Sequence, residues 1–545
     1  MGPMEAKVEE AEVDRALESR SSVMRKTLEA GKAIRVEDMP TDVWDAGYME
    51  EKGIHHMSFH AYLRKLADKR KSSGVRGSFF LLEDEVDALA DKVKKMDGQV
   101  VKLKDMPSAM ILARQPFRMV DYVQFESPAM FDAFLGGWRE SGNQRFGWLY
   151  GRYQVHEETP LGIAAVVCAI YEPPQTGYPD GLQLTLPDPD EATVDEVAAR
   201  LGLERVGMVF TDLVDDGTGT GKVRCKRHAN SFFVSSLECM FAADVQCQYP
   251  CVSKHSASGR FGSRMVSVVV SGDADHNVAP SAFQVSNQCM AMQKAGIIEA
   301  STNPALMRIV NPAATGSKQF VPDVIFKQKN EYGTEVTQSA KPTFPVEYLL
   351  VDVSCGFPKD VRPMFAAPVG GSAFPVENRD RGAAARQDWP TVHRHLGVSD
   401  QRAALADFHL LIFLAKSGLW DMKDDFPALC AFARAAAAAA TGSAGAADGD
   451  APSADELLVR VMESNSWQTM QSLLADGGGS LGSQAQTSGG GGNDGGGGAP
   501  SDADLAKYAA QLAQLAEMGF TDQARMVRLL NQHQGVVDLV LTDLF

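Results

Sequence analysis

The sequence contains little cysteine: eight residues in a chain of 545, and no two of them form a Cys-x-x-Cys pair. This excludes a disulfide-dense secreted scaffold and favours a reducing compartment, the cytosol or the nucleus. Long apolar runs are also missing. The longest have about ten residues, well short of the roughly 20 that span a bilayer. The first 30 residues alternate charged with apolar positions, so no secretory signal is expected.

Positive charge is in deficit. Lys and Arg number 53 against 70 Asp and Glu, which gives a net charge of −17. An overall field of this sign argues against a protein held on nucleic acid or on an acidic membrane. The basic run Lys65–Lys71 leaves two alternatives open, a nuclear import signal or a solvated helix face. Otherwise the composition is that of a globular protein, with 44% hydrophobic residues, enough for a sizeable core.

Shifts in composition divide the chain into segments, whose expected boundaries are 1–50, 51–115, 116–275, 276–475, 476–500 and 501–545. The first is acidic and helix-prone, with too few apolar residues for a domain of its own. The second carries three histidines and a basic stretch. The third and fourth form one continuous globular block, and their division rests on the family resemblance described below. The fifth is mostly Gly, Ser, Asn, Asp and Gln, so we expect a flexible linker to a tethered sixth module.

Within the globular block, short β-branched runs alternate with helical patterns. Four runs of strand length, each bounded by turn residues, are expected to form strands: Ile163–Ile170, Arg205–Phe210, Met265–Val270 and Val346–Val353. The spacing of apolar residues predicts a helix over Asp190–Leu201 and a buried helix over Asp407–Trp420. The alanine run Ala435–Ala440 is either a helix extension or a surface insertion. Together these patterns predict an α/β or α+β fold.

The last 45 residues predict three short helices. Gly519 breaks the first helical pattern between two large apolar neighbours, Met518 and Phe520. The segment resembles a ubiquitin-associated (UBA) domain over its whole length. The resemblance implies a small apolar surface that docks weakly on ubiquitin, and its expected residues are Met518, Gly519, Phe520, Leu541 and Leu544. The alternative is a bare three-helix bundle in which Met518 and Phe520 belong to the core.

Several strings in the central block are family-specific. They are HMSFHAYLRKL (56–66), NQRFGWLYGRYQVHEETPLGIAAVVCAIYEPPQ (143–175), RVGMVFTDL (205–213), FQVSNQCMA (283–291), VPDVIFK (321–327), FPVENR (374–379) and DFHLLIFL (407–414). Through them, the chain resembles the nuclear protein localization protein 4 family over roughly residues 50–420. The resemblance implies an adaptor that binds ubiquitin and polyubiquitin chains. With the ubiquitin-fusion-degradation protein 1 partner, it delivers clients to the valosin-containing AAA+ unfoldase for extraction and proteasomal degradation.

The same resemblance sets further expectations. It implies work in the cytoplasm and nucleus, with recruitment to the surface of the endoplasmic reticulum, and it implies neither a cofactor, a bound nucleic acid nor membrane insertion. It also implies a groove along the MPN and C-terminal regions that captures an unfolded ubiquitin. A free-standing ubiquitin receptor or shuttle, which would not co-purify with the unfoldase, is the alternative function.

The resemblance also implies that residues 116–275 form an MPN domain, an α/β fold shared with zinc deubiquitinases. Catalytic members need three protein ligands, an open fourth position for water and a glutamate as general base. Here Gln144 stands at the glutamate position, Phe210 and Asp212 at the histidine positions, and Glu238 at the downstream aspartate position. A phenyl ring cannot ligate a metal and an amide cannot act as the base. We therefore expect a degenerate metal site in a binding scaffold, with no enzyme activity; a metallo-deubiquitinase is the remote alternative.

Departures from the family pattern concern other expected metal and docking sites. Family members use cysteine-rich zinc segments before the MPN domain to sit on the unfoldase, but the first cysteine here is Cys168. No Cys-based zinc finger can form in residues 1–167, where His55, His56 and His60 are expected to be packing or surface residues. Members also generally begin with a ubiquitin-like domain, and this sequence starts after it. Domain loss, a separate polypeptide and a truncated sequence remain open.

One further cluster of metal-binding residue types lies in the globular block. It consists of Cys239, Cys247, Cys251 and His255. Its spacing is irregular beside structural zinc patterns. Buried or loop cysteines are the preferred interpretation.

Overall fold

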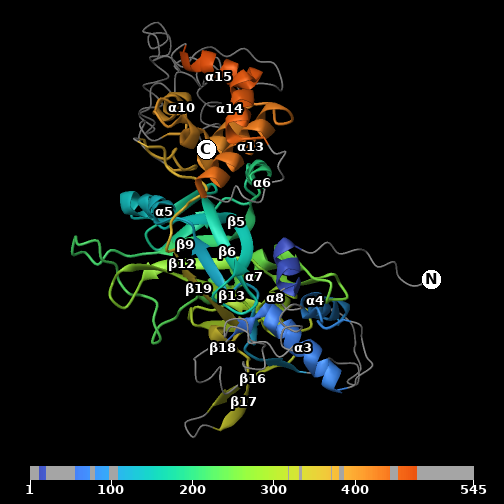
Figure 1. Cartoon of the computed structure of the whole chain (residues 1–545). Helices are drawn as coiled ribbons and strands as arrows, with labels where there is room; N and C mark the ends of the chain where they lie inside the picture. Colours follow the sequence, from blue (N-terminus) through green and yellow to red (C-terminus); the bar gives the residue numbers. More distant parts are fainter. Residues whose placement is uncertain are drawn as a thin grey trace, which may run out of the picture. The chain divides into compact units, whose positions relative to one another are not determined.

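The computed structural model describes residues 11–19, 56–73, 80–96, 109–316, 318–329, 334–369, 371–379, 386–441 and 452–475. All of them belong to a compact unit that runs from Met1 to Gly482. The expected linker and the three UBA helices lie outside the described residues. Within them the fold mixes helices with strands, which confirms the mixed α and β class (Figure 1). Among the described helices, none has the length and apolar character needed to cross a membrane.

A closed β-barrel forms the centre of this unit (Figure 1), with strand order β12–β13–β19–β4–β6–β5–β9. Its strands are β4 (Tyr122–Phe125), β5 (Phe146–His156), β6 (Gly162–Tyr171), β9 (Glu204–Asp212), β12 (Val266–Gly272), β13 (Val278–Val285) and β19 (Leu350–Gly356). β5 pairs antiparallel with both β6 and β9, and β9 closes the barrel by pairing parallel with β12. The pairing of β5 with β9 places the start of β5 beside the end of β9, where Phe146 lies opposite Phe210.

Three of the four predicted strands are confirmed as β6, β9 and β12. Every residue of β6 is buried, as expected for a continuous apolar run inside a covered sheet. The fourth prediction is wrong in its first half, because Val346–Leu349 form a 3₁₀ turn and β19 begins only at Leu350. Val346 and Leu349 are buried in this turn, and the carbonyl of Leu349 accepts a hydrogen bond from the N–H of Ser286 at 2.8 Å. These apolar side chains therefore pack in the core, although the backbone around them is not a strand.

The barrel crosses the boundary expected after residue 275. β13 and β19 lie beyond that residue, yet β13 pairs with β12 along its length, and β19 connects β13 to β4. The strands that close the barrel thus come from both expected segments.

Helices pack on the barrel and extend it. Those nearest the site are α5 (Pro128–Ser141), α6 (Glu191–Arg200), α7 (Ser236–Gln248) and α8 (Asn287–Lys294); α6 confirms the helix predicted over Asp190–Leu201. Buried residues of α7 and α8 share one hydrophobic cluster with β5 and β9. α7 begins with a capping box in which the Ser235 hydroxyl accepts from the Glu238 N–H and the Glu238 carboxylate accepts from the Ser235 N–H.

A helical region follows the barrel, and Figure 1 shows α10, α13, α14 and α15 grouped together. Its helices are α10 (Trp389–Leu396), α11 (Gln401–Leu405), α12 (Phe408–Lys416), α13 (Asp425–Thr441), α14 (Ala454–Glu463) and α15 (Asn465–Ala475). α12 confirms the predicted buried helix, although it ends before Trp420, and Asp407 caps its start. α13 includes Ala435–Ala440, so the alanine run is a helix extension. The Phe408 ring lies 5.9 Å from the Tyr150 ring of β5, which joins the helical core to the barrel.

Further helices and strands complete the described residues. They are a helix over residues 12–19, β1 (Met57–Ser58), α3 (Phe59–Ser73), α4 (Glu85–Met96), β2 (Met110–Leu112), β3 (Phe117–Arg118), β7 (Gln175–Tyr178), β8 (Gly181–Leu184), β10 (Pro250–Val252), β11 (Arg260–Ser263), β14 (Ile298–Ala300), β15 (Leu306–Ile309), α9 (Pro312–Thr315), β16 (Val324–Lys329), β17 (Glu335–Ser339) and β18 (Thr343–Pro345). The basic run Lys65–Lys71 lies on α3, where Lys65, Lys69 and Lys71 are exposed.

Candidate functional site

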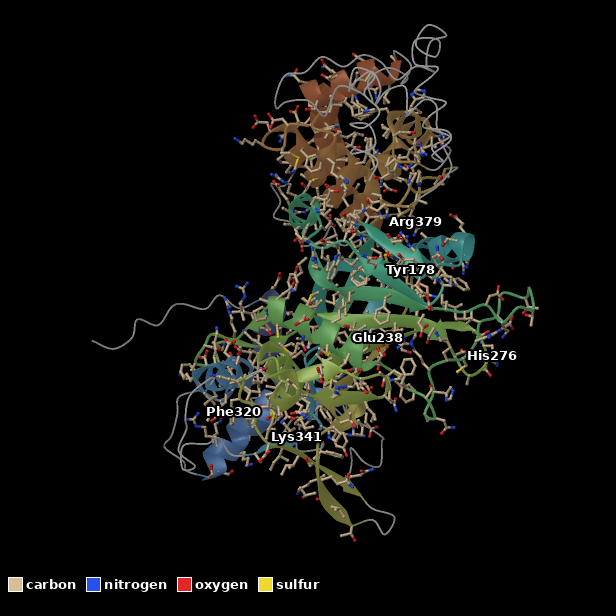
Figure 2. The ribbon with its side chains drawn as sticks, turned by 180° about the vertical axis from the view of Figure 1, so that it is seen from behind. Tyr178, Glu238, His276, Phe320, Lys341 and Arg379 are labelled. Carbon is tan, nitrogen blue, oxygen red and sulfur yellow. The ribbon has the colours of Figure 1, made fainter. Side chains whose placement is uncertain are left out.

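The four positions singled out from the sequence line one pocket of about 500 Å³. Gln144 precedes β5, Phe210 and Asp212 end β9, and Glu238 lies in the first turn of α7. The antiparallel pairing of β5 with β9 explains why Gln144 meets Phe210 and Asp212. Figure 2 shows Glu238 in the central part of the unit.

The Gln144 amide is buried and fully hydrogen-bonded. Its Nε2 donates to the carbonyls of Pro179 and Leu213 at 2.8 and 2.7 Å. Its Oε1 accepts from the hydroxyl of Thr211 at 2.8 Å and from the N–H of Leu213 at 3.0 Å. Both donors and both acceptor positions are therefore in use. Gln144 ties the start of β5 to the end of β9 and has no group that could take a proton from water.

A buried guanidinium lies between the two carboxylates of the pocket. Arg227 donates from Nε to Asp212 at 2.8 Å, and from Nη1 and Nη2 to Glu238 at 2.9 and 2.6 Å. Lys226 adds a second cation, with its Nζ 2.6 Å from Asp212. Burial by itself raises the pKa of Asp212, but the charge of Arg227 and the hydrogen bond from Lys226 outweigh it and hold that pKa below its ordinary value. Both carboxylates are thus committed to protein cations.

These residues do not fit a catalytic zinc ion. Phe210 offers no lone pair, and zinc would have to displace Arg227 from Asp212 and Glu238. Glu238 is also engaged by the capping box of α7. In the part of the chain that the structure describes, no group of three or more His, Cys, Asp or Glu has an arrangement suited to a metal ion.

The other wall of this pocket is apolar. Leu182 and Leu184 of β8 line it together with Phe210, Phe232 and Phe241. Leu237, which also lines the pocket, is 66% exposed, and Phe233, next in sequence to the lining residue Phe232, is 62% exposed. Grouped exposed apolar side chains of this kind mark interaction surfaces. This apolar wall can hold an apolar segment of a ligand.

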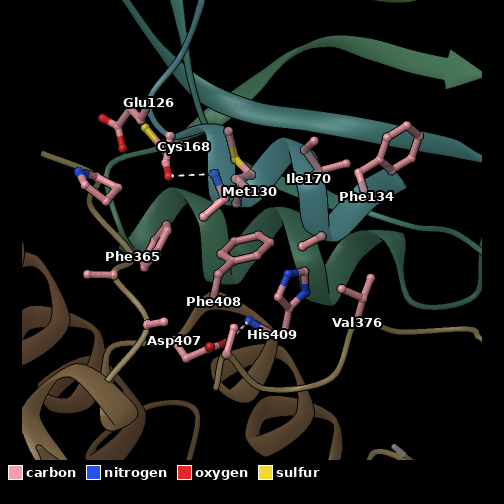
Figure 3. A pocket seen from close by; sticks show the side chains of 18 of the residues that line it. Glu126, Met130, Phe134, Cys168, Ile170, Phe365, Val376, Asp407, Phe408 and His409 are labelled. Carbon is pink, nitrogen blue, oxygen red and sulfur yellow. Dashed lines mark hydrogen bonds between the residues drawn. The ribbon is translucent and has the colours of Figure 1, made fainter. Parts of the chain in front are cut away.

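A second cavity, of about 270 Å³, lies between α5, β6 and α12 (Figure 3). Met130, Ile170 and Phe408 form part of its apolar lining. Glu172 is fully buried beside it and accepts from Nε of Arg145 and Nε of Arg379, each at 3.0 Å.

A further ion pair, largely buried, adjoins this cavity. The Nδ1 of His409 lies 2.9 Å from the carboxylate of Glu377. Burial by itself lowers the pKa of His409, but the negative charge of Glu377 outweighs it and raises that pKa. The pair of Arg379 with Glu172 fastens the segment that leads to α12 onto the barrel, and the pair of Glu377 with His409 joins the same segment to α12.

The other metal candidates from the sequence are dispersed. The ring nitrogen Nδ1 of His56 lies 2.8 Å from the carbonyl of Gln115, and His60 pairs with Asp14; His55 lies outside the described residues. The cysteine cluster does not converge on a common centre. Its members have separate neighbours: Cys239 contacts Cys289, Cys247 contacts Met290, Cys251 lies in β10 and His255 faces Glu18.

Sequence reasoning missed Arg227, the residue that organises the pocket. It follows Asp212 by 15 residues, after a glycine-rich loop. The adjacent basic pair Lys226–Arg227 was the available signal, because a pair of cations close in sequence to a predicted carboxylate site can neutralise it.

Comparison with known proteins identifies the family. A sequence model described as "NPL4 family" matches residues 145–474, and one described as "NPL4 family, putative zinc binding region" matches residues 8–142. The chain belongs to the NPL4 family. This confirms the family predicted from the sequence strings.

Individual NPL4 relatives are similar over most of their length. "Nuclear protein localization protein 4" of Debaryomyces hansenii is 41% identical over 429 residues, which cover 77% of this chain and 74% of that protein. The protein of the same name from Yarrowia lipolytica is 39% identical over 424 residues, covering 75% and 74%. "Nuclear protein localization protein 4 homolog" of Homo sapiens is 37% identical over 457 residues, covering 82% and 70%.

The second NPL4 match names a putative zinc-binding region, and the described residues of this region do not fit zinc. The sequence has no cysteine before Cys168. Of its described histidines, His56 contacts a backbone carbonyl and His60 contacts a carboxylate that also binds Arg264. Among the described residues, neither histidine belongs to a group of three or more His, Cys, Asp or Glu that could hold a metal ion.

Proposed function

We propose that this NPL4-family chain is a ubiquitin-binding adaptor and not an enzyme. With a partner of the ubiquitin-fusion-degradation protein 1 type, it recruits polyubiquitinated clients to the valosin-containing AAA+ unfoldase, which extracts and unfolds them for proteasomal degradation. The observation that carries the proposal is the NPL4 match over residues 145–474. This match covers most of the barrel, from β5 onward, and the helical region that follows.

The geometry of the degenerate site supports the non-enzymatic part of the proposal. The MPN interpretation assigns Gln144, Phe210, Asp212 and Glu238 to the positions of base and metal ligands. The amide of Gln144 is fully hydrogen-bonded, and Arg227 holds both carboxylates. Such a site binds without cleaving, because it lacks both a metal-activated water and a base.

The apolar wall of the same pocket supports a binding role. We assign to Phe233 and Leu237 a contact with an apolar stretch of ubiquitin or of an unfolding client, since both side chains are largely exposed and Leu237 lines the pocket. The groove implied by the resemblance would include this pocket. A UBA domain at residues 501–545 would add a second, weak ubiquitin contact, and linking the two through a flexible segment would raise the affinity for chains.

The free-standing ubiquitin receptor remains the second candidate, and one observation favours it. In the resemblance, the zinc segments seat the protein on the unfoldase, and the described residues of the corresponding region here do not fit zinc. A receptor would bind chains equally well and would leave the unfoldase inactive on them. Both candidates place the protein in the cytoplasm and nucleus; recruitment to the endoplasmic reticulum belongs to the adaptor.

An unfolding assay tests the proposal. Purified unfoldase, the partner, ATP and a polyubiquitinated fluorescent client are mixed with and without this chain. The proposal expects loss of client fluorescence only when the chain is present, and only when the client carries ubiquitin. Chain binding without any unfolding would support the receptor instead.

A matched pair of variants tests the pocket. Leu237→Asp places a charge in the lining of the pocket and should slow unfolding. Ile111→Asp, at a 52% exposed position on β2, should leave the rate unchanged. Equal rates for wild type and Leu237→Asp would remove the pocket from the proposal and leave the adaptor role standing.

A further inference from the structure

The helix over residues 12–19 lies against the barrel. It presents two apolar side chains one helical turn apart and, beside them, two carboxylates with the same spacing. Val13 and Leu17 are buried, and they pack against Leu161 and Ile163 at the start of β6. Asp14 and Glu18 follow them by one residue, so the two carboxylates share the neighbouring face of the helix. An apolar stripe and an acidic stripe thus run side by side.

The Asp14 carboxylate joins segments that are remote in sequence. Its Oδ1 lies 2.8 Å from Nε2 of His60, in the first turn of α3. The same oxygen accepts from Nη2 of Arg264, in the turn between β11 and β12. All three residues are buried. Burial by itself raises the pKa of Asp14, but the hydrogen bond from His60 and the charge of Arg264 outweigh it and lower that pKa.

Glu18 makes a second, more exposed link of the same kind. Nζ of Lys254 lies 2.6 Å and Nε2 of His255 lies 3.4 Å from its carboxylate. The loop that carries Lys254 and His255 is in turn bound to the segment before α4, because the carbonyl of His255 accepts from the N–H groups of Leu81 and Leu82 at 3.1 and 3.0 Å. Helix 12–19, α3 and the approach to α4 are therefore joined to the stretch of chain that runs from β10 to the start of β12.

Asp14, Glu18 and His60 belong to the region that matches the putative zinc-binding part of the NPL4 family, residues 8–142, and their partner Arg264 lies outside it, next to β12. A structural zinc ion would cross-link remote segments through thiolate and imidazole ligands. Here the sequence has no cysteine before Cys168, and a carboxylate with a histidine and an arginine makes the cross-link. The cross-link is a buried ion pair, and removing one partner of such a pair destabilises the folded protein.

We propose that the putative zinc-binding region of this chain folds without metal and is held on the barrel by the Asp14–His60–Arg264 cluster, with the Glu18 pair beside it. The proposal does not depend on the adaptor function. The arginine carries its charge at every accessible pH. Since the attachment contains no metal ion, a chelator has nothing to remove from it.

Metal content and chelator response of the full chain test the first half. The chain is expressed with added zinc, purified, and analysed by inductively coupled plasma mass spectrometry. We expect far less than one zinc per chain, and the same melting temperature with and without 1,10-phenanthroline. Stoichiometric zinc whose removal lowers the melting temperature would overturn the metal-free fold.

Hydrogen exchange of the full chain tests the second half. Asp14→Asn should speed exchange in residues 12–19 and at the start of α3 by about tenfold or more, the effect of losing a buried hydrogen bond to a charged group. Glu12→Gln, an exposed position on the same helix, is the control and should change nothing. Unchanged exchange in Asp14→Asn would overturn the anchor.

The milder Glu18→Gln keeps the test decisive if Asp14→Asn does not fold. It should speed exchange in residues 12–19 and leave α10 unaffected. Equal exchange in Glu18→Gln and wild type would then count against the anchor.

Discussion

Arg227 holds Glu238 with both of its terminal nitrogens, Nη1 at 2.9 Å from Oε2 and Nη2 at 2.6 Å from Oε1. The third donor group of the same guanidinium, Nε, lies 2.8 Å from Asp212. The two carboxylates that stand where the MPN interpretation places metal ligands are therefore joined by a permanent cation. Arg227 thus joins the end of β9 to the first turn of α7 without a metal ion.

Replacing Arg227 should destabilise the chain. Arg227→Met leaves Asp212 and Glu238 without their shared partner, and breaking a buried pair of this kind costs about 3 kcal/mol. The midpoint of urea unfolding, followed by tryptophan fluorescence, measures the effect. Arg139→Met is the matched control, because Arg139 and its partner Asp132 are both largely exposed, and the expected loss is below about 1 kcal/mol. Equal shifts for the two variants would contradict the bridging role of Arg227.

No metal-dependent cleavage of ubiquitin chains is expected. Polyubiquitin is incubated with the full chain, with zinc or with a chelator, and followed on gels. Gln144→Glu should not create activity, since Phe210 still cannot ligate a metal and Arg227 still occupies the carboxylates. Chelator-sensitive cleavage by the wild type would refute the interpretation of this pocket as a binding scaffold.

The pair of His409 with Glu377 should make stability depend on pH. The pKa of His409 is raised in the folded state. The protonated histidine therefore contributes its full stabilisation when the pH is below 6.5, the ordinary pKa of histidine. The stabilisation is lost as pH rises through the raised value. Wild type should therefore exceed His409→Gln in melting temperature by more at about pH 6 than at about pH 9.

A control and a counter-result complete this test. His393→Gln, at an exposed position on α10, should follow wild type at both pH values. A constant difference between wild type and His409→Gln would show that the charge of His409 does not matter to folding.

Deletion of residues 501–545 should weaken binding to polyubiquitin on the order of 10²-fold without abolishing it, because a linked pair of weak sites loses its avidity when one is removed. Biolayer interferometry on immobilised chains measures this. The double variant Met518→Ala with Phe520→Ala should reproduce the deletion, as the UBA resemblance places both residues on the docking surface. Complete loss on deletion would contradict a second ubiquitin contact in the barrel region.

Much of the barrel could be predicted because its strands carry local signals. β6, β9 and β12 are short runs rich in apolar and β-branched residues, a composition that favours buried strands. The convergence of Gln144 with Asp212 followed from the family resemblance, which assigns both residues to one degenerate metal site. That these positions form a degenerate metal site stays an interpretation.

Other features have no local signal. Asp14 and Arg264 are 250 residues apart, and no residue pattern near either one predicts that they pair. The pattern of Val346–Val353 fits a strand, but packing of Val346 and Leu349 selects a 3₁₀ turn first. Arg227 reaches Glu238 only because the loop after β9 folds back over the pocket. Such contacts depend on tertiary packing, which residue patterns do not encode.

Co-elution on a sizing column tests the adaptor proposal most directly. The full chain is mixed with the valosin-containing unfoldase, with and without the ubiquitin-fusion-degradation protein 1 partner. The account predicts that all three proteins elute together, and that the complex survives a chelator because the N-terminal region needs no zinc. Separate elution of the chain under both conditions would contradict the adaptor role and leave a free ubiquitin receptor.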